Sequence, residues 1–208
     1  GGYLAVAVEA PTKTDNGWVA LFDATSLEML GYEQVGAQPD MVTFTPDGEY
    51  VLTANEGEPS TDYQIDPVGS ISILGVSEGQ LVDVRTAGFS AFNTQADTLR
   101  SAGVRIYGPD ASVEQDLEPE YIAISSDSST DWVSLQENNA LAKVDIATAT
   151  VTDILPLGYK DHGTAGNGLD VSDSDDAINI DTWPGVLGMY QPDSIAAYEV
   201  DGETLLVT

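Results

Sequence analysis

The stretch QPDMVTFTPDGEYVLTANEGE, residues 38–58, decides the fold class of this chain. Residues 41–45 form a short alternating apolar run, residues 46–48 read Pro-Asp-Gly, and residues 50–54 form a second run. A Pro-Asp-Gly turn between two such runs predicts a β-hairpin. The hairpin ends in Asn-Glu-Gly-Glu, so carboxylates follow directly after its second strand.

The same pattern is written twice more along the chain. It returns as EPEYIAISSDSSTDWVSLQEN at residues 118–138 and as QPDSIAAYEVDGETLLVT at residues 191–208. The apolar runs at residues 18–23, 70–74 and 141–145 also correspond to one another. A repeated unit of short strands and acidic turns is typical of the blades of a β-propeller.

We therefore predict an all-β chain, a β-propeller built of four-stranded antiparallel blades. An antiparallel sandwich also uses many short strands, but it has no reason to repeat its acidic turns. About three blades fit in residues 1–208, whereas closed propellers typically have about four to eight. We expect an incomplete propeller whose repeat continues past residue 208. Insertions are expected at residues 86–116 and 158–190.

A short helix is predicted near residues 94–102, inside the first insertion. Good helix formers occupy this stretch, Asn93 is a candidate N-cap, and Gly103 follows as a candidate C-cap.

The composition restricts the partners. Six basic residues against 35 acidic ones give a formal charge of −29 at pH 7. DNA and RNA are excluded as obvious partners because a polyanion would be repelled. The surface instead suits divalent cations, high salt or solubility alone. No apolar run approaches the ~20 residues of a transmembrane helix. With no Cys and with His162 as the single histidine, a thiolate or histidine-based zinc site is also excluded.

Acidic residues recur at two places in each repeat, and these are the first candidate metal ligands. One set follows a proline where a strand begins, and the other stands where the next strand ends. The six residues are Asp40, Glu120 and Asp193 in the first set and Glu9, Glu56 and Glu137 in the second. Equivalent positions in successive blades face the same rim, so we expect a ring of carboxylates around the channel. The neighbouring amides expected in the same ring are Asn55, Gln136, Asn138 and Asn139.

Such a ring of hard oxygen ligands suits Ca²⁺ or Mg²⁺. The alternative is that these acids cap turns and accept backbone N–H bonds.

A second candidate calcium site is the loop DVSDSDDAINID, residues 170–181. Asp170, Asp173 and Asp175 are its candidate ligands. The match to an EF-hand loop is poor, because the sixth position is Asp175 instead of Gly and the twelfth is Asp181 instead of Glu. The alternative is a solvated acidic loop.

Several segments together resemble one known family. They are GWVALFDATSLE, QPDMVTFTPDGEYVLTANEGEPSTDY, FNTQADTLRSAGVRIYGP, DLEPEYIAISSDS, LQENNALAKVDIATATVTDILPLGYKDH, GNGLDVSDSDDAINI and MYQPDSIAAYEV. This string resembles the choice-of-anchor I family over nearly the whole chain. The resemblance implies a YVTN/WD40-like propeller in a longer, exported and surface-anchored protein of bacteria or archaea. It also implies a relation to mesenchyme-specific cell-surface glycoproteins and to proteins labelled atypical alkaline phosphatases.

Three functions follow as hypotheses. The first is an extracellular calcium-binding β-propeller that acts as a cell-surface or matrix binding and scaffold module. The second is a metal-dependent phosphoesterase resembling alkaline phosphatase, in which the ring would hold the metal that polarises a phosphoryl oxygen. The third is a structural repeat of a surface layer or filament. The corresponding partners are divalent cations, other surface or matrix proteins, and phosphate esters.

Overall fold

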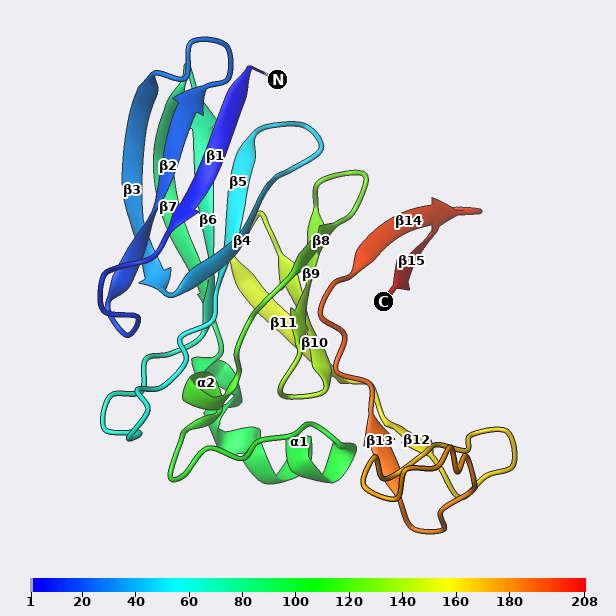
Figure 1. Ribbon diagram of the computed structural model, residues 1–208. Coiled ribbons are helices and arrows are strands. Elements are labelled where there is room, and N and C mark those ends of the chain that lie inside the picture. The colour runs from blue at the N-terminus through cyan, green and yellow to red at the C-terminus, as the bar shows by residue number, and fades with distance from the viewer. Residues whose placement is uncertain (1) are drawn as a thin grey trace.

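The computed structural model describes residues 2–208, whose regular structure is mainly antiparallel sheet (Figure 1). Two sheets have four strands each, in the order in which the strands occur in the chain. The first consists of β4 (Pro39–Phe44), β5 (Tyr50–Asn55), β6 (Ser70–Ser77) and β7 (Gln80–Gly88). The second consists of β8 (Ile122–Ile124), β9 (Thr130–Leu135), β10 (Ala140–Asp145) and β11 (Thr150–Pro156). The predicted four-stranded blade is therefore confirmed.

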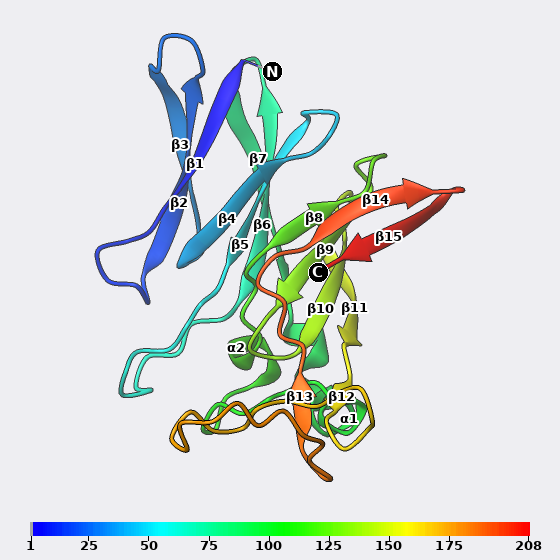
Figure 2. The same ribbon diagram turned by 45° about the vertical axis from the view of Figure 1, so that its right-hand side comes forward.

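Two smaller sheets flank this pair. One has three strands, β1 (Tyr3–Val8), β2 (Asn16–Asp23) and β3 (Met29–Ala37), and the other is the hairpin of β14 (Ala196–Val200) and β15 (Glu203–Val207). In Figures 1 and 2 the four sheets fan out as an open arc, which agrees with the expected incomplete propeller.

The repeated hairpin has the same turn in both large sheets. Thr45 donates from Oγ1 to Asp47 Oδ1 at 2.6 Å, and Ser125 donates from Oγ to Asp127 Oδ1 at 2.7 Å. A hydroxyl and a carboxylate thus satisfy each other inside the turn, which is why Thr/Ser and Asp recur two residues apart. The repeat in the sequence is a repeat in local structure.

Apolar layers between the sheets hold the arc together. One layer packs β2 and β3 against β5 and β6, with Val19, Leu21 and Leu74 fully buried. The largest layer joins the two four-stranded sheets and the helical insertion. A small third layer joins β8–β11 to the last hairpin through Ile195 and its neighbours. Each sheet is thus fixed by burial of apolar surface against the next one along the chain.

The first insertion contains the predicted helix and two elements that the sequence did not reveal. Helix α1 (Ala96–Ala102) ends at Gly103, whose φ of 105° is the left-handed conformation of a C-cap glycine. A 3-10 helix, η1 (Ser90–Gln95), precedes α1, and the short α2 (Val113–Asp116) follows it. Asn93 is not the N-cap, because it lies within η1 and its side chain pairs with Glu114.

The second insertion is mostly loop. Its regular elements are β12 (Tyr159–Asp161), β13 (Leu187–Met189) and an isolated bridge between Leu169 and Asp181. It forms a lobe beside α1 in Figure 1. Across residues 2–208, no helix is long and apolar enough to cross a membrane.

Candidate functional site

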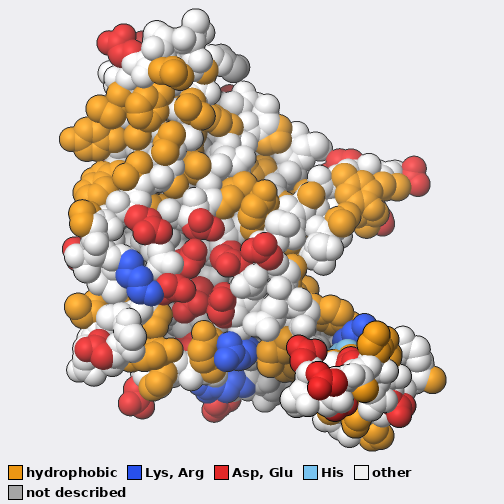
Figure 3. Space-filling view, in the orientation of Figure 1, with side chains coloured by type: hydrophobic (Ala, Val, Ile, Leu, Met, Phe, Trp, Pro, Cys, Tyr) orange, Lys and Arg blue, Asp and Glu red, His pale blue; other side chains and the backbone are white. Residues whose placement is uncertain are grey.

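Seven carboxylates gather where the inner strands of neighbouring sheets begin or end, and we call them the carboxylate cluster. They are Asp40, Glu56, Glu58, Glu118, Glu120, Glu137 and Asp193. Their charges raise the pKa of the more buried members, and Asp116 and Asp66, outside this set, add to the effect at Glu118. Figure 3 shows acidic side chains concentrated at the centre of this face.

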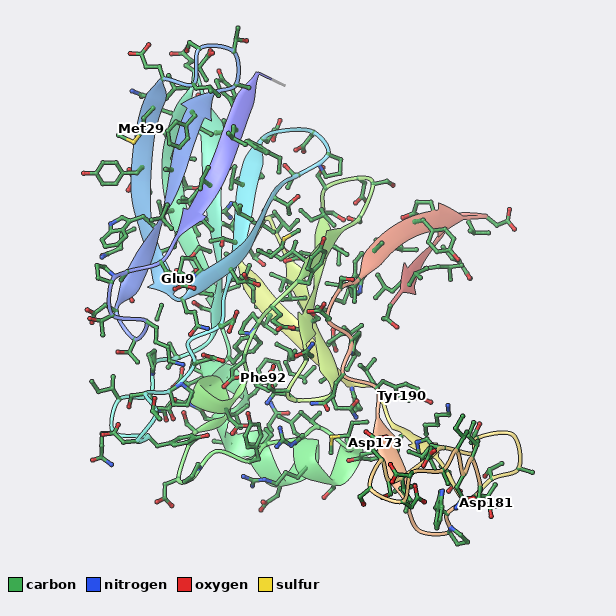
Figure 4. The ribbon with its side chains drawn as sticks, viewed as in Figure 1. Glu9, Met29, Phe92, Asp173, Asp181 and Tyr190 are labelled. Atoms are coloured by element: carbon green, nitrogen blue, oxygen red, sulfur yellow. The ribbon has the colours of Figure 1, made fainter. Side chains whose placement is uncertain are left out.

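The structure thus brings together five of the six repeated acids that the sequence singled out. Glu9, the sixth, lies exposed at the end of β1, and Figure 4 shows it beside the start of β4. Glu9 is not among the acids whose charge raises the pKa of Glu56, Glu118 or Glu120.

Glu56 is held by the residue that begins its own hairpin. Gln38 donates from Nε2 to Glu56 Oε2 at 2.6 Å, while its other side-chain atom, Oε1, is buried without a partner. Burial raises the pKa of Glu56 to about 8, and the negative charges of Glu58, Asp40 and others add to the effect. The site therefore offers a carboxylate that is costly to ionise next to an unused carbonyl oxygen.

Glu118 is the most deeply buried member of the cluster. It is 7% exposed, and its backbone N–H donates to Asn138 Oδ1 at 3.1 Å. Within residues 2–208 its carboxylate makes no hydrogen bond. Burial raises the pKa of Glu118 to about 8, with further contributions from Glu137 and Glu58.

Glu120 has a similar environment two residues later. Burial raises its pKa to about 7, and Glu137, Asp193 and Asp40 raise it further by repulsion. Its Oε2 is buried without a hydrogen-bond partner. Three carboxylates from two sheets thus have pKa values near or above neutrality for the same two reasons, burial and mutual repulsion.

The cluster has one positive neighbour. Lys13 donates from Nζ to Glu58 Oε2 at 2.5 Å, and this bond is the largest cause of the lowered pKa of Glu58. Lys13 is the one Lys or Arg in residues 2–208 that forms an ion pair with the cluster. Lys13 and Glu58 also line an open hollow of about 340 Å³ whose walls include Glu118 and Glu137.

A buried amide network supports Glu118 and Glu137 from below. Asn138 donates from Nδ2 to the Asp116 carbonyl at 2.6 Å and to the Arg105 carbonyl at 2.9 Å. Arg105 in turn donates from Nη1 to the Glu137 carbonyl at 3.2 Å and stacks on Tyr107 at 3.5 Å from the ring centroid. These contacts fix the backbone that carries the two acids.

The expectation that Asn138 and Asn139 face the channel is wrong. Both are fully buried, and Asn139 donates to the Gly158 carbonyl at 2.8 Å and accepts from the Tyr190 N–H at 2.9 Å. They hold the two insertions in place, because a buried amide is stabilising only when backbone groups satisfy it. Asn55 is fully buried as well, and its Nδ2 bonds to Ser70 and Ser72.

The donor atoms of the cluster fit a hard cation, although the cluster is not a ready-made metal site. In residues 2–208, no three Asp, Glu or His side chains are already arranged to hold a metal ion. The available atoms are carboxylate oxygens and the unpaired Oε1 of Gln38, which are ligand types that Ca²⁺ accepts in flexible geometry. A bound ion would have to draw these side chains together.

The acidic loop at residues 170–181 is separate from the cluster, in the lobe where Figure 4 shows Asp173 and Asp181. Asp170 accepts from the N–H groups of Ser172 at 3.3 Å and Asn179 at 3.0 Å. Asp175 accepts from Ala177 N–H at 3.2 Å, and Asp173 is exposed. Asp170 and Asp175 thus act as turn caps in this loop.

The sequence assigns Glu118 no role in the ring, and it indicates Glu58 only as part of a separate oxygen-rich loop with Glu56, Asp62 and Asp66. The repeat could have identified Glu118. It stands immediately before Pro119, as Gln38 and Gln191 stand immediately before the corresponding prolines of the other two copies. Glu58 has no counterpart in the other copies, and its place depends on the loop that leads to β6.

A family comparison covers the entire chain, and structural comparisons identify the fold. The structure resembles hydrazine synthase of Kuenenia stuttgartiensis with a TM-score of 0.52 and 12% identity, covering 100% of this chain and 55% of that one. Weaker similarities are a periplasmic gluconolactonase, PpgL, of Pseudomonas aeruginosa (TM-score 0.47, 13% identity, 96% and 45% covered) and the Cps50 (Swd1) β-propeller domain of Myceliophteria thermophila (TM-score 0.45, 12% identity, 74% and 44% covered).

The chain thus spans about half the length of these structures. No curated protein sequence matches it. The model of the choice-of-anchor I domain matches residues 1–208. The chain therefore belongs to the choice-of-anchor I domain family.

Proposed function

We propose that this chain is part of an extracellular surface or matrix-binding module and that its carboxylate cluster binds calcium. The observation that carries the proposal is that Glu56, Glu118 and Glu120 are all partly or fully buried near the same two acids, Glu58 and Glu137, with a single ion-paired lysine, Lys13, beside them. Membership in a choice-of-anchor family supports the surface location.

Like charges that are brought together and partly buried need a counter-charge. Without a cation, the cluster reduces its repulsion by taking up protons, as the pKa values of about 8 for Glu56 and Glu118 and about 7 for Glu120 indicate. A divalent ion would replace those protons and remove the repulsion at the same time. Calcium suits this cluster better than a rigidly octahedral ion because it accepts irregular sets of six to eight oxygens.

The expected consequence of binding is mechanical. Asp40 lies in β4 and Glu56 directly follows β5, whereas Glu120 precedes β8 and Glu137 follows β9. An ion shared between them would tie neighbouring sheets together at their inner edge. Extracellular modules typically bind calcium with dissociation constants of about 10⁻⁴–10⁻³ M, which matches a stabilising role outside the cell.

No observation favours hydrolysis of a phosphate ester at this cluster. Arg85 donates from Nη1 to the Ala147 carbonyl at 2.7 Å, and Arg100 donates from Nε to the Ile106 carbonyl at 3.1 Å. Arg105 is engaged with the Glu137 carbonyl. The three arginines thus donate hydrogen bonds to backbone carbonyls. A phosphate approaching the cluster would meet mainly carboxylates.

Thermal unfolding with millimolar calcium and with chelator tests the proposal. Calcium should raise the melting temperature of the parent chain by mass action. The Glu120→Gln variant should lose most of this increase, whereas the double variant Asp173→Asn/Asp175→Asn in the separate loop should keep it. An increase that persists in Glu120→Gln and disappears in the loop variant would assign calcium to the loop instead. No increase in the parent chain would remove the calcium proposal.

A further inference from the structure

The hollow beside the carboxylate cluster has two tyrosines in its walls. It is the open space of about 340 Å³ whose rim carries the ion pair of Lys13 and Glu58. Tyr63 and Tyr107 line it and are 45% and 40% exposed, so both rings are partly open to solvent. Glu118 lines the same hollow. Aromatic side chains next to carboxylates favour an organic cation as the ligand.

A small recess adjoins this hollow. Tyr63, Tyr107 and Glu118 line both spaces, and the recess is lined in addition by Asp66 and Asp116. The volume of the recess is about 10 Å³, which is close to the room that one water molecule needs. A primary ammonium group is of that size, whereas a planar guanidinium or a trimethylammonium group exceeds it.

Two carboxylates of the recess have acceptor atoms that nothing in the chain satisfies. Glu118 is 7% exposed, and its carboxylate makes no hydrogen bond within residues 2–208. Oδ1 of Asp66 is buried without a hydrogen-bond partner. A buried acceptor without a donor costs free energy, so both carboxylates favour a ligand that donates hydrogen bonds and carries positive charge.

The third carboxylate, Asp116, is satisfied and fixes the shape of the recess. It accepts from the backbone N–H of Tyr107 at 3.0 Å and from the backbone N–H of Gly108. Gln115 donates from Nε2 to the Asp66 carbonyl at 3.0 Å, which ties the loop that carries Asp66 to helix α2. The recess is thus formed by contacts within the chain, before any ligand enters it.

The chain itself shows that a carboxylate of this hollow accepts an alkylammonium group. Lys13 extends from the loop between β1 and β2 and donates from Nζ to Glu58 Oε2 at the rim. Among residues 2–208, no Lys or Arg side chain forms an ion pair with Glu118. The rim therefore has its counter-charge, and the recess does not.

We propose that the hollow and its recess bind a lysine side chain of a partner protein. The ammonium group enters the recess and donates to Glu118 and Asp66, while the four-carbon stem packs against Tyr63 and Tyr107. The inference rests on the proposed role as a surface or matrix-binding module, because it names the group by which that module holds its partner.

The charges around the hollow favour a lysine within a polypeptide over a free amino acid. A free amino acid would bring its own carboxylate next to Glu58 and Glu137, which line the hollow, whereas a lysine within a chain brings none. The formal charge of −29 attracts any basic partner at long range. The selection of lysine among cations therefore depends on the size of the recess.

Calorimetric titration with short peptides, in the presence of chelator, tests the proposal. The probe is an alanine peptide with blocked ends and one central lysine, and the controls carry arginine, trimethyllysine or side-chain-acetylated lysine in its place. We expect the lysine peptide to bind at least about tenfold more tightly than each control, because the first two exceed the recess and the third has no charge.

Three results of these titrations would overturn the proposal. The first is the absence of saturable binding of the lysine peptide in the millimolar range. The second is equal or tighter binding of the arginine or trimethyllysine peptide, which would reduce the effect to net charge. The third is binding of free butylamine without binding of the lysine peptide, which would assign the recess to free amines.

Two substitutions separate this pocket from the calcium proposal. Asp66→Asn keeps the shape of the side chain and removes its charge, so it should weaken binding of the lysine peptide at least about tenfold and keep the calcium-dependent rise in melting temperature. Glu120 lies outside the hollow and the recess, and Glu120→Gln should have the opposite pair of effects. Asp62→Asn, at an exposed position of the same loop, is the matched control and should change neither.

Tyr63→Ala adds a variant at an exposed side chain, where the fold does not depend on the ring. It should weaken binding of the lysine peptide severalfold through lost contact with the stem. Unchanged peptide binding in both Asp66→Asn and Tyr63→Ala would overturn the lysine pocket. Intact peptide binding without any calcium-dependent rise in melting temperature would support the pocket and remove the calcium proposal alone.

Discussion

Gln38 and Glu56 close the first repeated hairpin through two hydrogen bonds. Gln38 donates from Nε2 to Glu56 Oε2 at 2.6 Å, and Glu56 donates its backbone N–H to the Gln38 carbonyl at 3.0 Å. Gln38 has a φ of 52°, which is the left-handed region that disfavours residues with a side chain. The side-chain bond to Glu56 offsets this local cost and holds the carboxylate at the cluster.

Two alternative substitutions of Gln38 separate the contribution of its side-chain hydrogen bond from that of its backbone strain. Gln38→Ala removes the hydrogen bond and keeps the strain, so it should lower the free energy of unfolding by about 1–2 kcal/mol. Gln38→Gly removes the same bond but relieves a left-handed strain of about 1 kcal/mol, so it should be less destabilising. Urea unfolding measures both. Greater destabilisation by Gly than by Ala would contradict this account of the turn.

The cluster should make stability depend on pH in the absence of calcium. The folded-state pKa values of Glu56 and Glu118 are about 8 and that of Glu120 is about 7, against an ordinary value of 4.5. Because the folded state binds these protons more tightly, their contribution is fully present below about pH 4.5 and is lost as the pH rises through 7 to 8. Urea unfolding in chelator should therefore show a falling midpoint between about pH 5 and pH 9.

Glu118→Gln provides the matched variant for this pH dependence. Glutamine has the same shape and no charge, so the fall should become shallower. A midpoint that rises over the same range in the parent chain, or an unchanged slope in Glu118→Gln, would contradict the proposed repulsion.

The parts of the structure that the sequence predicted are those that belong to the sequence repeat. The hairpin of residues 38–58, its copy at 118–138 and their third strands were identified because alternation and turn residues recur in register. Five of the six repeated acids meet for the same reason, since equivalent positions in neighbouring sheets share one rim. Glu9 remains apart because β1 has no inner partner in the described residues.

The features that the sequence did not reveal depend on unique contacts. Helix α2 has only four residues, too few to show a helical periodicity in the sequence. It is stabilised by the capping box between Ser112 and Gln115 inside a long loop. The position of Asn138 directly after an acidic turn predicts a side chain that faces the channel. It is instead drawn inward by Asp116 and Arg105, residues of an insertion whose path the repeat does not define.

Asp131 should be replaceable with a gain in stability. It is fully buried in β9, both its side-chain oxygens lack a hydrogen-bond partner, and burial raises its pKa well above the ordinary value. The repeat places Val51 at the same position of β5, opposite Phe44 as Asp131 is opposite Ile124. Asp131→Val should therefore raise the free energy of unfolding by about 1–3 kcal/mol at neutral pH.

The pH dependence of this gain identifies its cause. The unfolded chain ionises Asp131 near its ordinary pKa of 3.8, so the penalty for keeping it protonated in the folded state grows as the pH rises above that value. The gain from Asp131→Val should be smaller at about pH 4 than at pH 7. Loss of stability in Asp131→Val would show that the carboxyl group has a stabilising partner.

Gly69 should be intolerant of any side chain. A Cβ atom at this position would lie 1.9 Å from the Leu117 carbonyl oxygen, and the Gly69 N–H donates to the Glu114 carbonyl at 2.9 Å. Gly69→Ala should lower the free energy of unfolding by at least about 2 kcal/mol, because the backbone next to Glu118 would have to move.

Gly88 is the matched control for this substitution. It pairs with Ser70 across the β6–β7 ladder, and a Cβ there would meet nothing within 4 Å. Gly88→Ala should change the free energy of unfolding by less than about 0.5 kcal/mol in the same urea experiment. Equal effects at the two positions would contradict the packing of residues 114–118 against the start of β6.

Calorimetric titration with calcium at about pH 7.5, in two buffers of different ionisation enthalpy, tests the central claim most directly. The account predicts saturable binding with a dissociation constant of about 10⁻⁴–10⁻³ M. It also predicts proton release, because Glu56, Glu118 and Glu120 are partly protonated before the ion binds. Glu120→Gln should weaken binding at least tenfold. Saturable binding without proton release, or no saturable binding in the millimolar range, would contradict calcium binding by the carboxylate cluster.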